Sequence, residues 1–150
     1  MGDAIFVTSG YNVGSALIRV SGGNATVMWK KAYRCVYASP ILVGDCLYAL
    51  IESGWMKARL VCVSVKDGSI RWTRKKVGSG GLMLADGKLI VLSRRGDLIL
   101  AEASPAAYTE IARATIFSVG ACWNSPVLCN GRIYARNEKG TLVCLDVRGE

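Results

Sequence analysis

The sequence predicts an all-β protein, and three observations support this fold class. One turn-and-strand segment occurs four times, with its central apolar residues Ile5, Leu47, Leu89 and Ile133 at spacings of 42, 42 and 44 residues. The apolar segments between these turns are short and rich in β-branched residues, which is typical of strands. No segment shows the apolar periodicity of a helix. A period of about 42 residues that holds four short strands predicts a β-propeller segment of about four blades.

Each unit divides into four strands, which we number from the propeller axis outward. The first is a short apolar strand before a Gly/Asp/Asn turn, and that turn leads into the second strand. Pro40 and Pro126 stand at the starts of two first strands, where a missing amide hydrogen is tolerated. First strands are expected at 39–42, 81–84 and 125–128, third strands at 16–20, 60–65, 98–103 and 142–147, and fourth strands at 26–29, 69–72 and 109–113.

This assignment gives approximate blades at 1–33, 34–77, 78–119 and 120–150, with three, four, four and three strands. The first unit has no innermost strand and the last has no outermost strand. An open strand edge is a template for pairing, and propellers are normally closed. We therefore expect the segment to close by association.

Five aromatic positions and two arginines are candidates for specific roles. Trp29 and Trp72 end two fourth strands and are expected to pack between neighbouring blades. Trp123 precedes a first strand, near the mouth of the axial channel. Trp55 lies in a hairpin tip. The candidate contacts for a partner or ligand are Trp55, Trp123, Tyr37, Arg94 and Arg95.

The third and fourth strands resemble a known repeat. Residues 62–72 are similar to the tryptophan-docking motif A-x-D-x-x-T-G-x-x-x-W of the pyrroloquinoline-quinone-like propeller family: Gly68 and Trp72 match, whereas Cys62, Ser64 and Asp67 replace alanine, aspartate and threonine. Residues 142–147 are similar to its first half, and residues 125–134 to the family's S-P-V-x-x-x-G-x-x-Y opening. The chain resembles the C-terminal half of a longer bacterial member. The resemblance implies a propeller fold and, in most members, partner binding rather than quinone binding.

The residue inventory indicates a binding module and not an enzyme. The chain has no histidine and no adjacent cysteine pair, so the commonest general base and the disulfide of the quinone-dependent dehydrogenases of this superfamily are missing. No C-x-x-C pair or Asp-rich loop suggests a zinc or calcium site. We expect no cofactor and no metal. A fragment of a quinone-dependent dehydrogenase remains the alternative.

Charge and cysteine content indicate possible partners and surroundings. The formal net charge of +8 favours acidic partners, although its basic residues are scattered, so a nucleic-acid surface is a further alternative. The six cysteines, some of them inside apolar strands as at Cys62 and Cys144, are expected to be reduced and structural, with a disulfide left open.

The expected function is a non-catalytic binding or scaffold module that associates through its open ends. The simplest closure is a homodimeric ring of about eight blades, in which a two-fold axis satisfies both ends at once. A complementary propeller half from another chain, or a lone four-bladed ring, would also close it. The sequence has no apolar run of membrane-spanning length and no signal peptide. It predicts a cytoplasmic protein if this chain is complete, and an exported one if it belongs to a longer protein.

Overall fold

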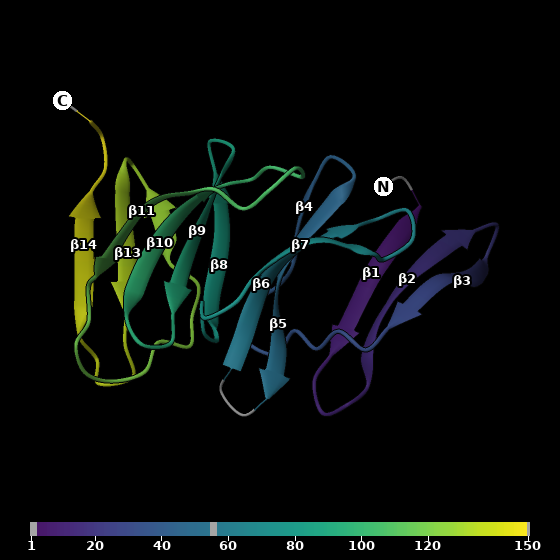
Figure 1. Ribbon diagram of the computed structural model, residues 1–150, viewed down its shortest axis with the longest axis horizontal. Helices are drawn as coiled ribbons and strands as arrows, with labels where there is room; N and C mark the ends of the chain where they lie inside the picture. The colour runs from purple at the N-terminus through teal and green to yellow at the C-terminus, as the bar shows by residue number, and fades with distance from the viewer. Residues whose placement is uncertain (1–2, 55–56, 150) are drawn as a thin grey trace.

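The computed structural model describes residues 3–54 and 57–149, which form four antiparallel sheets placed side by side (Figure 1). The sheets have three, four, four and three strands, as the repeat predicts. Sheet 1 contains β1 (Ala4–Ser9), β2 (Gly14–Ser21) and β3 (Asn24–Lys31), and sheet 2 contains β4 (Ile41–Val43), β5 (Cys46–Gly54), β6 (Lys57–Ser64) and β7 (Ile70–Arg74). Sheet 3 contains β8 (Gly80–Ala85), β9 (Lys88–Ser93), β10 (Asp97–Glu102) and β11 (Glu110–Thr115), and sheet 4 contains β12 (Val127–Cys129), β13 (Arg132–Arg136) and β14 (Leu142–Asp146).

Tight turns set the register of the inner hairpins. Asp86 and Gly87 join β8 to β9 with φ of 47° and 67°, and Asn130 and Gly131 join β12 to β13 with φ of 48° and 69°. Two successive residues with positive φ make a turn whose twist matches that of the strands, and Asp-Gly and Asn-Gly are the pairs that adopt it most readily. The repeated turns seen in the sequence are therefore the hairpin tips of successive blades.

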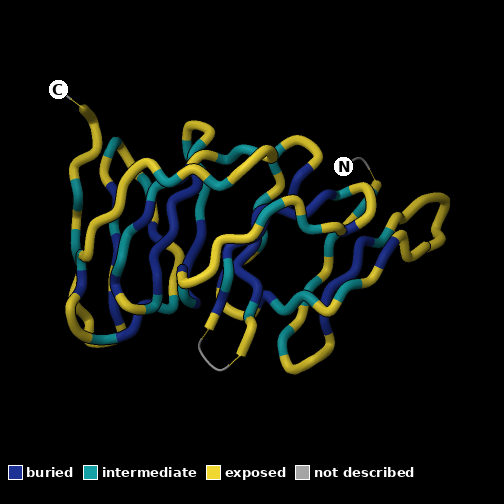
Figure 2. The backbone as a smooth tube through the Cα atoms, viewed as in Figure 1, coloured by how far each residue is buried: buried dark blue, intermediate teal, exposed yellow. Residues whose placement is uncertain are grey.

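Neighbouring sheets pack face to face, and the core lies between them. One cluster joins sheets 1 and 2 around Leu17 and Val61, a second joins sheets 2 and 3 around Tyr48 and Leu89, and a third joins sheets 3 and 4 around Cys122. Sheet 2 is covered on both faces, so six consecutive residues of β5, 46–51, are buried (Figure 2).

The terminal sheets are covered on one face only. Along β1, partly buried and exposed residues alternate, and so they do along β14. Ile5 is 53% exposed, whereas Leu47 at the same position of sheet 2 is 3% exposed. Sheets 1 and 4 lie at opposite ends of the array (Figure 1). The four sheets therefore form an open arc rather than a lone four-bladed ring.

The uncovered faces of the terminal sheets correct the expectation that the cysteines inside apolar strands, such as Cys144, are structural. Cys62 and Cys144 occupy equivalent positions, since they pair with Tyr48 and Tyr134. Cys62 is fully buried, but Cys144 is exposed and so is Cys129. Their exposure has a simple cause: their side of sheet 4 has no neighbouring sheet among the described residues. All six cysteines are free thiols.

Candidate functional site

One side of the array is built from loops rather than two-residue turns. It contains the described turns β1–β2, β9–β10 and β13–β14 together with the loops between sheets, which lie along the lower side of Figure 1. We call this side the loop face, and the opposite side, with the Asp-Gly and Asn-Gly hairpins, the turn face. The loop face brings together three of the five residues that the sequence proposes as contacts.

Tyr37, Arg94 and Trp123 form a cluster on the loop face. The ring centroids of Tyr37 and Trp123 are 4.7 Å apart, and the Arg94 guanidinium carbon lies 5.0 Å from the Trp123 ring centroid. Tyr37 and Trp123 stand at the same repeat position, two residues before the Ser-Pro pairs that precede β4 and β12. The repeat therefore places both rings where the loops of sheets 2 and 4 converge.

Trp123 is fixed by a polar contact. Its Nε1 donates a hydrogen bond of 3.2 Å to Glu138 Oε2, and this bond holds the pKa of the Glu138 carboxyl below its usual range. The backbone N–H of Glu138 donates to the Ala121 carbonyl at 2.8 Å. The turn that carries Glu138 is organised by the buried Asn137, whose Oδ1 accepts from the N–H groups of Lys139 and Thr141.

Arg94 is anchored through its backbone while part of its side chain has no partner. Its N–H donates to the Ser79 carbonyl at 2.5 Å, and its carbonyl accepts from the Cys122 N–H at 3.0 Å. Its Nε is buried and has no hydrogen-bond partner among the described residues. A buried, unpaired donor is costly. Only the partly exposed remainder of this side chain can meet an acceptor from outside the chain.

A hollow of about 300 Å³ adjoins the cluster. Its lining is Trp123, Asn124, Arg136, Asn137, Glu138 and Gly140. With the Asn124 amide oriented to satisfy both groups, its oxygen accepts from Arg136 Nε at 2.9 Å and Nη2 at 2.8 Å. Arg136 is thereby held at the wall of the hollow.

The two remaining contact candidates stand outside this cluster. Arg95 is exposed and neighbours Arg94 in the β9–β10 turn, but it makes no contact with the Trp123 ring among those the structure records. Trp55 lies outside the described residues. Sequence reasoning did not single out Glu138, Arg136 or Asn124 for this site, because nothing in a one-dimensional pattern brings the β13–β14 turn to Trp123.

The charges of the two faces are arranged differently. On the turn face, ion pairs join Arg71 to Asp45 at 2.5 Å and Lys88 to Asp86 at 2.9 Å, and Asp146 pairs with Arg132 and Arg148. On the loop face, Glu138 lies in the β13–β14 turn and Glu52 near the end of β5, and the cations there form no ion pair within the described chain. Those cations are Arg34, Lys57, Lys75, Lys76, Arg94, Arg95, Arg136 and Lys139.

Trp29 and Trp72 each donate a hydrogen bond to a neighbouring sheet. Trp29 Nε1 donates to the Val65 carbonyl at 2.8 Å, and Trp72 Nε1 donates to the Ser104 carbonyl at 2.8 Å, so each ties its own sheet to the next. Gly68 leaves room for the Trp29 ring, since a Cβ there would lie 2.9 Å from it. In sheet 3 the equivalent position is Ala112, which is exposed and cannot make this contact.

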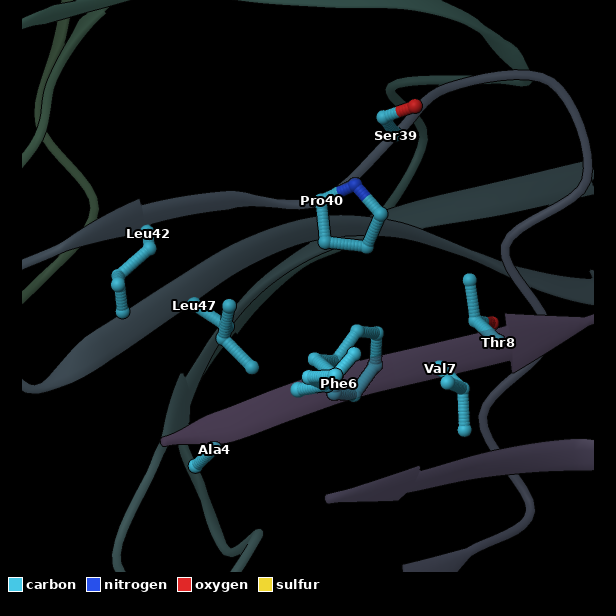
Figure 3. Close-up of a pocket in the computed structure, with 9 residues that line it drawn as sticks. Ala4, Phe6, Val7, Thr8, Ser39, Pro40, Leu42 and Leu47 are labelled. Carbon is cyan, nitrogen blue, oxygen red and sulfur yellow. The ribbon is translucent and has the colours of Figure 1, made fainter. Parts of the chain in front are cut away.

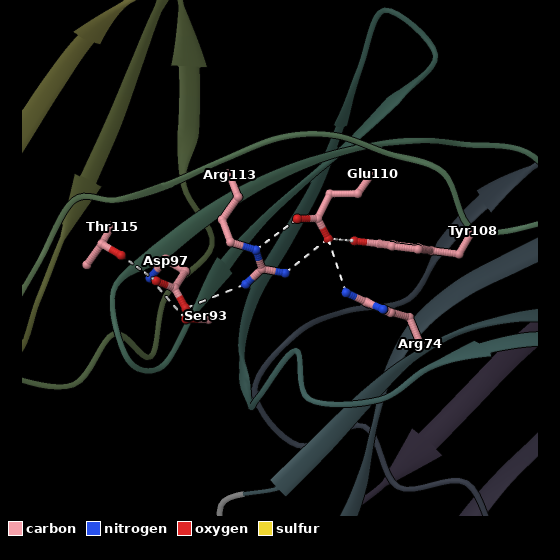
Figure 4. A network of polar contacts seen from close by, with 7 residues as sticks. All are labelled: Arg74, Ser93, Asp97, Tyr108, Glu110, Arg113 and Thr115. Carbon is pink, nitrogen blue, oxygen red and sulfur yellow. Dashed lines mark hydrogen bonds and ion pairs between the residues drawn. The ribbon is translucent and has the colours of Figure 1, made fainter.

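A polar network supports the outer seam between sheets 2 and 3 (Figure 4). Glu110 accepts from Tyr108 Oη at 2.6 Å and from Arg113 Nε at 2.8 Å, and Arg74 of β7 lies 3.6 Å away. The Arg113 and Tyr108 hydrogen bonds hold the pKa of Glu110 at about 2, and burial together with the Glu110 contact raises the pKa of Tyr108 to about 12. This arrangement is structural, because all its groups are satisfied by one another.

A second hollow, of about 630 Å³, lies beside β1 (Figure 3). Its walls include Phe6 of β1, Pro40 before β4, and Leu42 and Leu47 of sheet 2. The Val20 N–H bonds to the Asp3 carbonyl, so by antiparallel alternation Ala4, Phe6 and Thr8 direct their backbone groups away from β2. In sheet 2 the corresponding edge of β5 is paired with β4. The hollow therefore lies along an open strand edge.

No metal site is evident among the described residues, and two of the buried thiols are poorly reactive. They contain no group of three or more metal-ligating side chains. Burial raises the pKa of Cys35 to about 11 and that of Cys46 to about 12, which keeps both thiols protonated and poorly nucleophilic. In the described part of the chain no helix is long and apolar enough to cross a membrane.

The sheets and their face-to-face packing define a β-propeller segment. The structure of BamB from Moraxella catarrhalis, a β-propeller, is similar to this chain with a TM-score of 0.69 and 16% sequence identity. The match covers 96% of this chain and 42% of BamB, so the chain spans less than half of that protein. No family model and no curated protein matches the sequence. At this level of identity the likeness establishes the fold.

Proposed function

We propose that this chain is a non-catalytic binding module of the pyrroloquinoline-quinone-like propeller type that acts by associating through its two terminal sheets. The observation that carries the proposal is the open face of sheet 1. Ile5 and Val7 are 53% and 42% exposed, whereas Leu47 and Ala49, at the same positions in sheet 2, are both 3% exposed against sheet 1. Side chains that pack against a neighbouring blade in one repeat are left uncovered in another.

We propose that a second copy of the chain supplies the neighbour, giving a homodimeric ring of about eight blades. In such a ring the open face of sheet 4 in one copy covers the open face of sheet 1 in the other, twice. The sheet 4 face carries Val127, Tyr134, Leu142 and Cys144, and Tyr134 and Cys144 correspond to Tyr48 and Cys62 in the core between sheets 2 and 3. Both faces therefore present side chains at blade-packing positions.

Sedimentation equilibrium of the purified chain tests the homodimer. We expect a particle of twice the 16.1 kDa chain mass at micromolar concentration. Leu142→Asp places a charge in the seam and should give the mass of one chain. Val119→Asp is the matched control, because Val119 is 68% exposed and Leu142 65%, and Val119 lies on the loop face.

Thiol labelling gives a second measure of the seam. The exposed Cys144 should react with a maleimide slowly in the wild type and rapidly in Leu142→Asp, because assembly covers this face. A wild-type particle of 16.1 kDa at tens of micromolar would overturn the homodimer. A stable particle with Cys144 fully reactive would show that another surface joins the copies, and would overturn the proposed seam.

A further inference from the structure

The loop face carries aromatic rings, unpaired cations and a hollow at one place. We propose that this surface binds an acidic polypeptide segment, with carboxylates taken by Arg94 and Arg136 and an apolar side chain seated on Tyr37 and Trp123. The proposal goes beyond ring closure, since Tyr37, Arg94 and Trp123 lie on the loop face and not on an open sheet face. Arg136 stands opposite Leu142, where the loop face meets the open face of sheet 4.

Arg94 has the features of a prepared carboxylate-binding group. Its guanidinium lies over the Trp123 ring, which restricts its orientation, and its backbone is held by Ser79 and Cys122. Its Nε is buried, so a carboxylate would meet the partly exposed remainder of the side chain. A guanidinium presents a planar set of donors that matches a carboxylate, and holding it in place in advance reduces the entropy lost on binding.

Arg136 provides a second anchoring point across the hollow. The hollow of about 300 Å³ is lined by both Arg136 and Trp123 and is large enough for a short acidic side chain. Asn124 fixes the Arg136 side chain, while Asn137 fixes the turn beside it by accepting from Lys139 and Thr141. Glu138 forms part of the same wall, but its carboxylate is engaged by Trp123 Nε1.

The exposed apolar side chains favour a polypeptide over a nucleic acid. Tyr37 is 44% exposed, and the aliphatic Val36 and Val119 on the same loops are 43% and 68% exposed. Aromatic residues and arginine are enriched at protein interfaces, where they surround apolar contacts. A nucleic acid could contact the aromatic rings and the cations, but it would not bury the exposed valine side chains. The charge of this face also selects for acidic partners, because its cations are not neutralised within the described chain.

The test uses a fluorescein-labelled peptide that repeats Glu-Glu-Leu four times, measured by fluorescence anisotropy against the wild-type protein. Its counterpart with Gln in place of Glu is the ligand control. We expect saturable binding of the acidic peptide and at least about tenfold weaker binding of the Gln peptide, because charge-assisted hydrogen bonds are lost. Raising the salt concentration should weaken the acidic peptide but not abolish its binding.

Variants locate the site. Arg94→Gln and Tyr37→Ser should each weaken binding about five- to tenfold, whereas Lys66→Gln, which removes the same charge from the turn face, should change it less than about twofold. Tyr37 and Arg94 reach solvent, and thermal denaturation of each variant verifies that it is folded. All three variants should keep the oligomeric mass of the wild type. A loss of peptide binding can therefore be distinguished from a loss of ring assembly.

Three outcomes would overturn the proposal. The acidic and Gln peptides could bind equally, Lys66→Gln could weaken binding as much as Arg94→Gln, or the acidic peptide could fail to bind. A labelled single-stranded DNA of the same length serves as a third ligand. If DNA binds more tightly than the peptide and Arg94→Gln abolishes that binding, the surface is a nucleic-acid site instead.

Discussion

Trp29 and Trp72 each contact the sheet that follows their own. Trp29 contacts Gly68 and donates to Val65, and Trp72 repeats the donation one blade further on, to Ser104. The two tryptophans were predictable, because the motif spacing alone places them at the ends of fourth strands. The pairing of Tyr37 with Trp123 was not, because the distance between two loops depends on how far the arc curves between sheets 2 and 4.

Gly68 provides a test of the tryptophan-docking contact. Its φ is +70°, and a Cβ there would also meet the Trp29 ring. Gly68→Ala should lower the free energy of unfolding by about 2–3 kcal/mol, of which about 1 kcal/mol is the cost of a left-handed backbone. Gly22→Ala is the matched control, since Gly22 has φ of +57° and open space around its Cβ position. Urea denaturation measures the free energy of unfolding of both variants. If both lose the same amount, the contact with the Trp29 ring does not contribute to stability.

At the scale of strands, the number and order of elements follow directly from the repeat. All fourteen strands form in the predicted order and with the predicted number per sheet. What the repeat does not predict is the side-chain network that compensates for a missing tryptophan. Where β11 has Ala112 instead of tryptophan, Glu110 and Arg113 on the same strand form ion pairs and hydrogen bonds that reach back to β7.

The Glu110 network should make stability depend on pH. Because the folded-state pKa of Glu110 is lowered to about 2, its contribution is present above the ordinary glutamate pKa and is lost as the pH falls through about 2. Glu110→Gln should therefore cost about 0.5–1 kcal/mol at pH 7, a value suited to a partly exposed pair. The difference in the free energy of unfolding between this variant and the wild type should decrease as the pH falls from 5 to about 2.

Urea titrations at a series of pH values measure this dependence. Glu102→Gln on the adjacent strand is the control, because Glu102 is exposed and makes no ion pair with a described residue. If Glu110→Gln lowers the free energy of unfolding by the same amount from pH 7 to pH 2, the carboxylate has no electrostatic role in stability.

For the whole molecule, the open arc makes the two terminal faces unlike each other. Sheet 1 presents Ile5 and Val7, and sheet 4 presents Tyr134 and Leu142 beside the Arg132–Asp146 pair, whose charged atoms lie 3.8 Å apart. A ring joined at such faces must pair sheet 1 with sheet 4. Contact between two identical faces would instead leave the other face of each copy exposed.

Mixing two variants distinguishes these arrangements. Ile5→Asp and Leu142→Asp should each be monomeric alone, because each carries a charge in both seams of its own dimer. Mixed in equal amounts, they should form dimers held by one undamaged seam, with weaker affinity than wild type. Sedimentation velocity measures the masses. If only one variant is monomeric and the mixture forms no mixed dimer, the two copies contact each other through identical faces.

The sequence by itself determined the fold class and the number of strands per sheet. Those features rest on local chemistry repeated at a regular spacing: Asp-Gly and Asn-Gly turns, short apolar strands and a tryptophan at a fixed offset. Only the tertiary structure decided which repeat positions are buried. Cys62 and Cys144 stand at equivalent positions, yet one is covered by a neighbouring sheet and the other is exposed. It also decided which loops meet, because the Tyr37–Arg94–Trp123 cluster depends on the curvature of the arc, which no single repeat contains.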